Sequence, residues 1–339
     1  MTDTTWPNQS ERDFIIKNFQ FGSGETLPEL RQKYFTFGTP RRNSAGQIAN
    51  AVLLIHNTTG TGKSWLLPEL AGELFGPDQP LDATQYFFIV PDMIGFGGSS
   101  KPSDGLRARF PHYRYVDMVV AQHRLITEDL AIPHLHLIVG MSMGGMLTWM
   151  FGQMFPDFMD ALLPIASQPG PMSGRNWIQR RLNIEAIRND PEWNDGDYEK
   201  NPSRWVFTAP IGALMTQSVV RIQEMAPTRE AGDALYKRFV ERAKTGDANN
   251  RLYQLEASMD YDPSGDLDKI KARLFAINFA DDELNPPALG VLEPAIARIP
   301  GARCVTVPAG PTTQGHYSTM RAAVWKSYLA EFMAGLPQR

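Results

Sequence analysis

The chain of 339 residues carries a formal net charge of −4 and has no long basic run, which argues against nucleic acid as a partner. Its one cysteine, Cys304, excludes an intrachain disulfide and a cysteine-based zinc cluster. Since its apolar runs are too short to cross a bilayer and its first residues lack a basic and apolar signal segment, we expect a cytoplasmic protein with no membrane partner.

Residues 1–20 are predicted to form a polar, loose leader. Beyond them, short β-rich runs alternate with longer segments of helical periodicity. The predicted strands are 34–37, 51–56, 86–90, 135–139, 161–165, 273–278 and 304–307, and the predicted helices are 65–75, 115–130, 143–155, 287–299 and 318–336. Several strands are almost continuously hydrophobic, as is typical of strands covered on both faces, so the alternation predicts a mostly parallel, doubly wound α/β sheet.

The segment 168–255 interrupts this alternation. It opens on Pro/Gly punctuation at 168–171, contains several tryptophans, and has helix-like stretches without strands between them. Open α/β sheets bind their ligands outside the carboxyl ends of the strands. We therefore predict a helical cap over those ends at 168–255, inserted into an α/β core made of 21–167 and 256–339.

A serine lies between two glycines where a predicted strand meets a predicted helix, in the sequence Gly140-Met141-Ser142-Met143-Gly144. This G-x-S-x-G pattern at a strand-to-helix turn is the nucleophile elbow of the α/β-hydrolases. The turn forces the serine into a strained backbone conformation and brings the flanking residues against neighbouring backbone, which only glycine tolerates. Ser142 is therefore the predicted nucleophile.

A serine hydroxyl needs a base, and the base needs a group that orients it. In this fold the three residues follow one another as Ser, acid, His. His316 is the single histidine after Ser142, and it lies in a loop between the last predicted strand and helix, which makes it the predicted base. The acid is expected after the preceding strand. Asp282 is the first choice by its spacing to Pro286, and Asp281 is the alternative.

Backbone N–H groups that face the developing oxyanion complete such a site. Met143 supplies one by following the nucleophile, and the loop after strand 51–56 is expected to supply the other. Thr58 is the first candidate there and Asn57 the next, and Asn57 is also a candidate substrate contact. The same loop continues into 60–64, which resembles the end of a phosphate-binding loop but lacks its leading glycine, so nucleotide binding is disfavoured.

Nearly the whole chain resembles the homoserine O-acetyltransferase branch of the α/β-hydrolase superfamily. The matching motifs lie in both the core and the cap, and the cap motifs are the more specific. They are 21–28, 34–39, His56-x-x-Thr59-Gly60, 142–146, 186–193, 196–198, 247–249, 258–260, Asp282-x-Leu284-x-Pro286-Pro287 and Gly315-His316. The resemblance implies that Ser142, Asp282 and His316 form the triad and that an acyl-enzyme forms on Ser142.

One departure from that branch concerns the substrate. The resemblance places a carboxylate-binding arginine of the acetyltransferases where this chain has Ile184. An apolar side chain cannot replace a bidentate contact between guanidinium and carboxylate. Arg180 and Arg181 precede Ile184 by one helical turn, so Arg181 or its neighbour is a candidate substitute, and Ile184 itself is a candidate substrate contact.

These features predict a serine hydrolase that acts on a small ester or acyl substrate and needs no cofactor or metal. One alternative is an O-acyltransferase that uses acetyl-CoA, because both share the acyl-enzyme. A second is a non-catalytic protein that binds a ligand in the hydrolase pocket. A homodimer through the cap is a further hypothesis.

Overall fold

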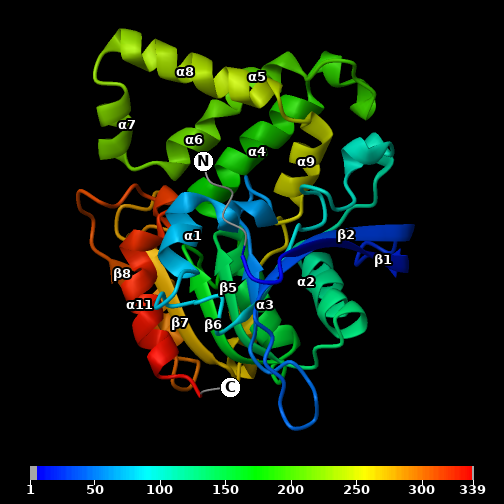
Figure 1. Cartoon of the computed structure of the whole chain (residues 1–339). Coiled ribbons are helices and arrows are strands. Elements are labelled where there is room, and N and C mark those ends of the chain that lie inside the picture. Colours follow the sequence, from blue (N-terminus) through cyan, green and yellow to red (C-terminus); the bar gives the residue numbers. More distant parts are fainter. Residues whose placement is uncertain (1–5, 338–339) are drawn as a thin grey trace.

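The structure, a computed structural model, describes residues 6–337 of the chain. Its centre is a single eight-stranded sheet in the order β1-β2-β4-β3-β5-β6-β7-β8 (Figure 1). The strands are β1 (Ser10–Gln20), β2 (Thr26–Gly38), β3 (Ala51–Ile55), β4 (Phe87–Pro91), β5 (Leu135–Met141), β6 (Met159–Ile165), β7 (Arg273–Phe279) and β8 (Arg303–Val307). The pairs from β4 to β8 are all parallel, which confirms the predicted mostly parallel sheet.

The first two strands form an antiparallel hairpin at one edge of the sheet. Its first strand corrects the prediction of a loose leader over 1–20, because Ser10–Gln20 form β1 and pair with β2 along their length. Ile16 and Phe19 of β1 are buried, whereas most of its other side chains are exposed or half-buried. Residues 1–5 of the predicted leader lie outside the described part of the chain.

Two hydrophobic layers cover the faces of the parallel strands, as the alternation of side chains along β3 illustrates. Leu53 and Ile55 belong to one buried cluster, and Val52 and Leu54 belong to the other. The helices α2 (Tyr115–Arg124) and α3 (Met143–Met154) contribute to the first cluster, with α10 (Leu292–Ile296) further along. The helices α1 (Pro68–Leu74) and α11 (Ala322–Ala334) cover the second. The sheet is thus doubly wound.

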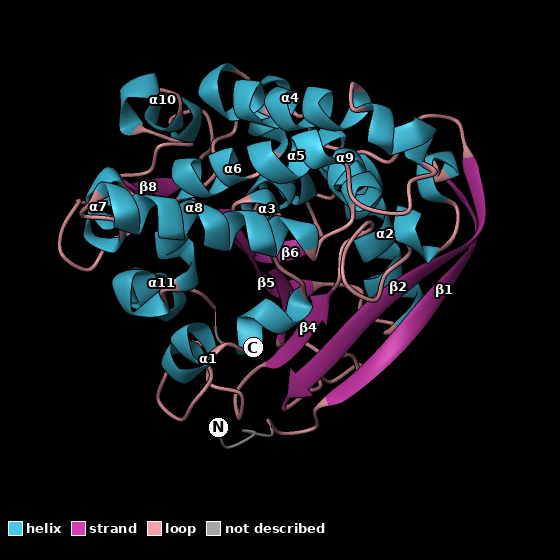
Figure 2. Ribbon diagram, turned by 90° about the horizontal axis from the view of Figure 1, so that it is seen from above, coloured by secondary structure: helices cyan, strands magenta, loops and turns pink. Residues whose placement is uncertain are grey.

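All remaining α-helices lie in one insertion between β6 and β7, a segment that the structure describes completely and in which it contains no strand. Figures 1 and 2 show these helices as a layer over one end of the central strands. They are α4 (Gly174–Arg188), α5 (Ser203–Thr208), α6 (Pro210–Thr216), α7 (Val219–Met225), α8 (Arg229–Lys244) and α9 (Ala248–Glu256). Across residues 6–337, no helix is both long and apolar enough to cross a bilayer.

Candidate active site

The turn from β5 into α3 holds Ser142 in a backbone conformation that non-glycine residues rarely adopt, with φ of 55° and ψ of −111°. Its neighbours must be glycine. A Cβ atom on Gly140 would lie 2.0 Å from the carbonyl oxygen of Gly144, and one on Gly144 would lie 2.3 Å from that of Ile55. The close packing of α3 against β3 and β5 therefore fixes the elbow that the sequence predicts.

Three side chains from distant parts of the chain meet at this elbow. His316, in the loop between β8 and α11, lies with its Nε2 2.7 Å from Ser142 Oγ. Its Nδ1 lies 2.8 Å from Asp282 Oδ2, in the turn after β7. All three side chains are buried, so water competes little for these hydrogen bonds. The arrangement has the geometry of a nucleophile, a base and an orienting acid.

The two adjacent aspartates have different partners. Asp282 faces His316, and its Oδ1 accepts hydrogen bonds from the N–H groups of Leu284 and Asn285 at 2.7 and 3.1 Å. Asp281 Oδ2 instead accepts bonds from the Thr313 hydroxyl and the Gly315 N–H, both at 2.9 Å. Asp281 therefore fastens the loop that carries the imidazole, while Asp282 contacts the imidazole itself.

A fourth side chain, Asn285, was not among the predicted site residues. Its Nδ2 donates to the Ala166 carbonyl at 2.9 Å and to Asp282 Oδ2 at 3.3 Å. Asn285 thus ties the carboxylate to the end of β6 and limits the directions in which Asp282 can rotate. Its position three residues after an acid in a turn was a signal, but only the fold shows which backbone carbonyl it reaches.

The loop after β3 begins beside the elbow, because Ile55 pairs with Gly140 in the sheet. Within it, His56 Nδ1 lies 2.7 Å from the Asn57 carbonyl oxygen, and Nε2 accepts the Met93 N–H at 3.1 Å. This pattern assigns the proton to Nδ1. Burial lowers the pKa of His56, which keeps the ring neutral. In a trans peptide the N–H points opposite to the carbonyl, so His56 also sets the direction of the Thr58 N–H.

Loss of the His56 ring is expected to disturb that direction. The sequence-based expectation that the Thr58 N–H binds the oxyanion predicts that His56→Ala lowers kcat for a test ester by about 10²-fold while KM changes much less, because such a donor acts mainly in the transition state. Steady-state kinetics with a short-chain p-nitrophenyl ester measure the separate changes in kcat and KM. The control is His112→Ala, which removes a half-buried imidazole whose Nδ1 lies 3.2 Å from Glu25 Oε2, away from the loop after β3. An unchanged kcat in a folded His56→Ala variant would exclude this positioning role.

The other predicted oxyanion and substrate residues have distinct surroundings. Met143 is the first residue of α3 and is buried. The Thr58 hydroxyl is buried without a hydrogen-bond partner among the described residues. Asn57 uses its side chain within the protein, since Oδ1 accepts the Thr59 N–H at 3.0 Å and Nδ2 donates to Met320 Sδ at 3.1 Å. The Asn57 side chain therefore stabilises the loop and connects it to Met320.

The predicted substrate residues of the cap lie on two sides of α4. Ile184 is buried in the hydrophobic cluster that also contains α2 and α3. Arg181 is exposed and forms an ion pair with Glu185 on the same helix. Arg180, the neighbouring candidate for the same role, is buried, and its Nε lies 3.2 Å from Asn176 Oδ1.

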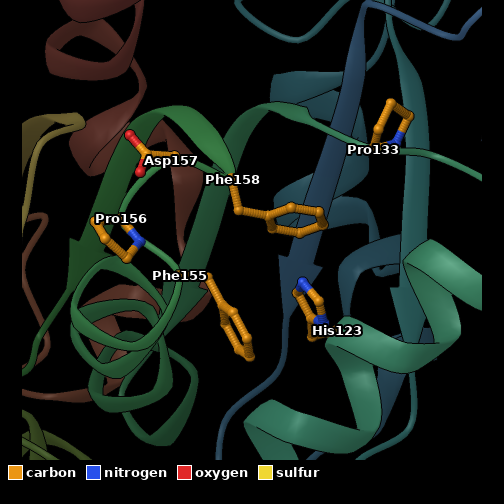
Figure 3. Close-up of a pocket in the computed structure, with 6 residues that line it drawn as sticks. All are labelled: His123, Pro133, Phe155, Pro156, Asp157 and Phe158. Carbon is orange, nitrogen blue, oxygen red and sulfur yellow. The ribbon is translucent and has the colours of Figure 1, made fainter.

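A surface hollow of about 310 Å³ lies at the opposite end of the sheet. Figure 3 shows the aromatic rings of His123, Phe155 and Phe158 around it, with Pro133 nearby. His123 stacks on Phe155 with ring centres 3.8 Å apart. Because Pro133 precedes β5 and Phe158 precedes β6, the hollow is near the starts of these strands, whereas Ser142 follows the end of β5. It is therefore separate from the elbow.

Comparison with known proteins agrees with this architecture. A family model described as the alpha/beta hydrolase fold matches residues 50–314. The chain is 26% identical to a probable acyltransferase of Methanothermobacter thermautotrophicus, over 95% of this chain and 97% of the relative. It is 30% identical to a homoserine O-acetyltransferase of Haloferax volcanii, over 81% of this chain and 75% of the relative.

Solved structures show the same fold at lower identity. An acetylester hydrolase from Corynebacterium glutamicum has a TM-score of 0.81 at 23% identity and covers 96% of both chains. A homoserine O-acetyltransferase from Bacillus anthracis has a TM-score of 0.82 at 20% identity, over 97% of this chain and 98% of its own. The chain therefore belongs to the α/β-hydrolase fold family, in the branch that is similar to homoserine O-acetyltransferases.

Proposed function

We propose that the protein is a serine hydrolase that cleaves an ester or similar acyl bond of a small substrate, with Ser142, His316 and Asp282 as its catalytic triad. The single observation that carries the proposal is the continuous hydrogen-bonded chain from Ser142 Oγ through His316 to Asp282, with distances of 2.7 and 2.8 Å. A protein that only binds a ligand has no need for this chain on a strained elbow, which disfavours the non-catalytic alternative.

In the proposed first step, Ser142 Oγ attacks the substrate carbonyl carbon while His316 Nε2 takes the hydroxyl proton. Asp282 stabilises the imidazolium that forms, and the N–H groups of Thr58 and Met143 stabilise the oxyanion. The tetrahedral intermediate collapses as the bond to the leaving alcohol breaks, and His316 returns the proton to that alcohol. An acyl group then remains on Ser142.

In the second step, His316 takes a proton from water, and the hydroxide oxygen attacks the acyl carbon. The attack forms a second tetrahedral intermediate. As it collapses, the carboxylic acid is released and His316 returns the proton to Ser142 Oγ. We propose that the segment 168–255 acts as the cap that receives the substrate above the elbow, since its helices lie over the ends of the strands (Figure 2).

An O-acyltransferase that uses acetyl-CoA is the second candidate, favoured by the names of the Methanothermobacter and Haloferax relatives. Both reactions form the same acyl-enzyme and differ in whether water or an alcohol resolves it. Ile184, where the resemblance to acetyltransferases implies an arginine, supports hydrolysis over transfer to homoserine.

A thiol-release assay separates the two candidates. With acetyl-CoA as the acyl donor, we expect release of free thiol to stay unchanged when homoserine is added, because water is the acceptor. A parallel assay with p-nitrophenyl acetate should show turnover without any added alcohol. A sharp, saturable rise of thiol release with homoserine would instead establish the transferase.

A further inference from the structure

Two arginines of the cap lie close together without an acidic partner. Arg180 on α4 is buried, and Arg251 is on α9, which packs against α4. The charge of Arg180 is near enough to contribute to the lowered pKa of Arg251. Within residues 6–337, neither guanidinium forms an ion pair, and the side chain of Arg251 forms no hydrogen bond.

The acidic residues of the two helices are already paired with other arginines. Glu185, the one acid of α4, pairs with Arg181 on the outer side of that helix. Glu256, the one acid of α9, pairs with Arg188. The carboxylates of the two helices are therefore both paired with arginines other than Arg180 and Arg251.

Neutral polar groups complete the surroundings of the arginines. Arg180 Nη1 donates to Ser258 Oγ at 3.3 Å, and that hydroxyl donates to the Leu255 carbonyl at 2.8 Å. Tyr115 begins α2 and is fixed beside the end of α9 by a bond from its N–H to the Ala257 carbonyl at 3.1 Å. Its hydroxyl is buried and has no hydrogen-bond partner among residues 6–337. Ser258 thus holds Arg180 in place, and the Tyr115 hydroxyl is a donor that no described residue uses.

The pair is electrostatically costly in the empty protein. Burial, followed by the charge of Arg180, lowers the pKa of Arg251 to about 10, so the Arg251 guanidinium stays protonated at neutral pH. Arg180 is buried and Arg251 is half-buried, and two such like charges without a counter-charge are unfavourable. An anion between them would relieve both the repulsion and the loss of hydration. Figure 1 shows α4 and α9 above the sheet. The chain enters these helices after the end of β6, which pairs with the end of β5 just before the elbow.

We propose that Arg180 and Arg251 form a binding site for a carboxylate group of the substrate, so that the protein acts on esters that carry a negative charge. The inference rests on the proposed hydrolase function. Guanidinium groups bind carboxylates through charge-assisted, often bidentate hydrogen bonds. The Tyr115 hydroxyl is available as a third donor.

A binding experiment tests the site without catalysis. Ser142→Ala protein is titrated by calorimetry with monomethyl succinate, which carries one carboxylate, and with dimethyl succinate, its neutral counterpart. We expect the charged ester to bind at least about tenfold more tightly. Adding Arg251→Gln should remove this difference, and Arg251→Lys should retain part of it. Equal binding of both esters, or an unchanged difference in Arg251→Gln, would overturn the proposal.

A turnover experiment then asks whether the bound carboxylate belongs to the substrate. With Ser142 intact, p-nitrophenyl hemisuccinate is compared with p-nitrophenyl butyrate, a pair in which the charge lies on the acyl group. In a second pair, 3-acetoxypropanoate is compared with propyl acetate, and the charge lies on the alcohol. One of the two ratios of kcat/KM should favour the charged ester and fall about tenfold in Arg251→Gln. The control is Arg229→Gln, which removes an exposed positive charge at the start of α8.

The two experiments separate the failure of this inference from that of the hydrolase proposal. If no ester is turned over but the charged ester still binds through Arg251, the anion site stands and the hydrolase proposal fails. If neutral and charged esters are hydrolysed equally in both pairs, the hydrolase proposal stands and the carboxylate site is refuted.

Discussion

Replacement of Ser142 by alanine is expected to lower kcat for a short-chain p-nitrophenyl ester by about 10⁴-fold or more, because no acyl-enzyme can form. Labelling by a fluorophosphonate should disappear with it, since Oγ is the atom that we expect the reagent to phosphonylate. The measurement combines initial rates with mass spectrometry of the treated protein. Ser142 is buried at the elbow, and alanine keeps its Cβ, so the fold is expected to persist.

The control is Ser23→Ala, which removes an exposed hydroxyl in the turn before β2. It should keep both the turnover and the labelling of the natural chain. Fluorophosphonate labelling that persists in Ser142→Ala at the original rate would contradict the assignment of the nucleophile.

The change Asp282→Asn is expected to lower kcat by about 10⁴-fold without unfolding the protein. The carboxylate accepts a hydrogen bond from His316 Nδ1–H, at 2.8 Å, which keeps the ring proton on Nδ1 and leaves Nε2 free to accept the proton of Ser142. An amide can present its NH₂ group to Nδ1 instead, which favours the opposite tautomer and blocks the base. Rates with a p-nitrophenyl ester give the effect, and circular dichroism confirms the fold.

The neighbouring carboxylate gives a matched comparison. Asp281→Asn keeps an acceptor oxygen for the Thr313 hydroxyl and the Gly315 N–H, and should therefore cost about tenfold or less. A larger loss in Asp281→Asn than in Asp282→Asn would reverse the assignment of the orienting acid.

Local sequence was sufficient to predict the elbow, because its geometry depends on a few consecutive residues. Gly140 and Gly144 are required by contacts within the turn and with the adjacent strand, and the pattern G-x-S-x-G expresses that requirement directly. Chain order singled out His316, the one histidine after Ser142, and the structure has its Nε2 2.7 Å from Ser142 Oγ. The alternation of hydrophobic strands and helices likewise sufficed for the parallel sheet.

Tertiary contacts decided what the sequence left open. The choice between Asp281 and Asp282 depends on which carboxylate faces the imidazole, and adjacent residues in a turn differ in this only through the fold. The strand Ser10–Gln20 is mostly exposed, so its hydrophobic pattern is weak and its pairing with β2 defines it. Arg251 was not predicted for the same reason, because its nearness to Arg180 arises from the packing of α4 on α9.

The place of the inserted helices in the chain allows them to vary independently of the residues at the strand ends. Ser142 precedes the insertion, whereas Asp282 and His316 follow it, and the insertion leaves and re-enters the core through β6 and β7, which are neighbours in the sheet. Changes in the length or sequence of α4 to α9 can therefore accumulate without moving the residues at the strand ends. Evolution can therefore change the residues that lie above the elbow while Ser142, Asp282 and His316 keep their positions.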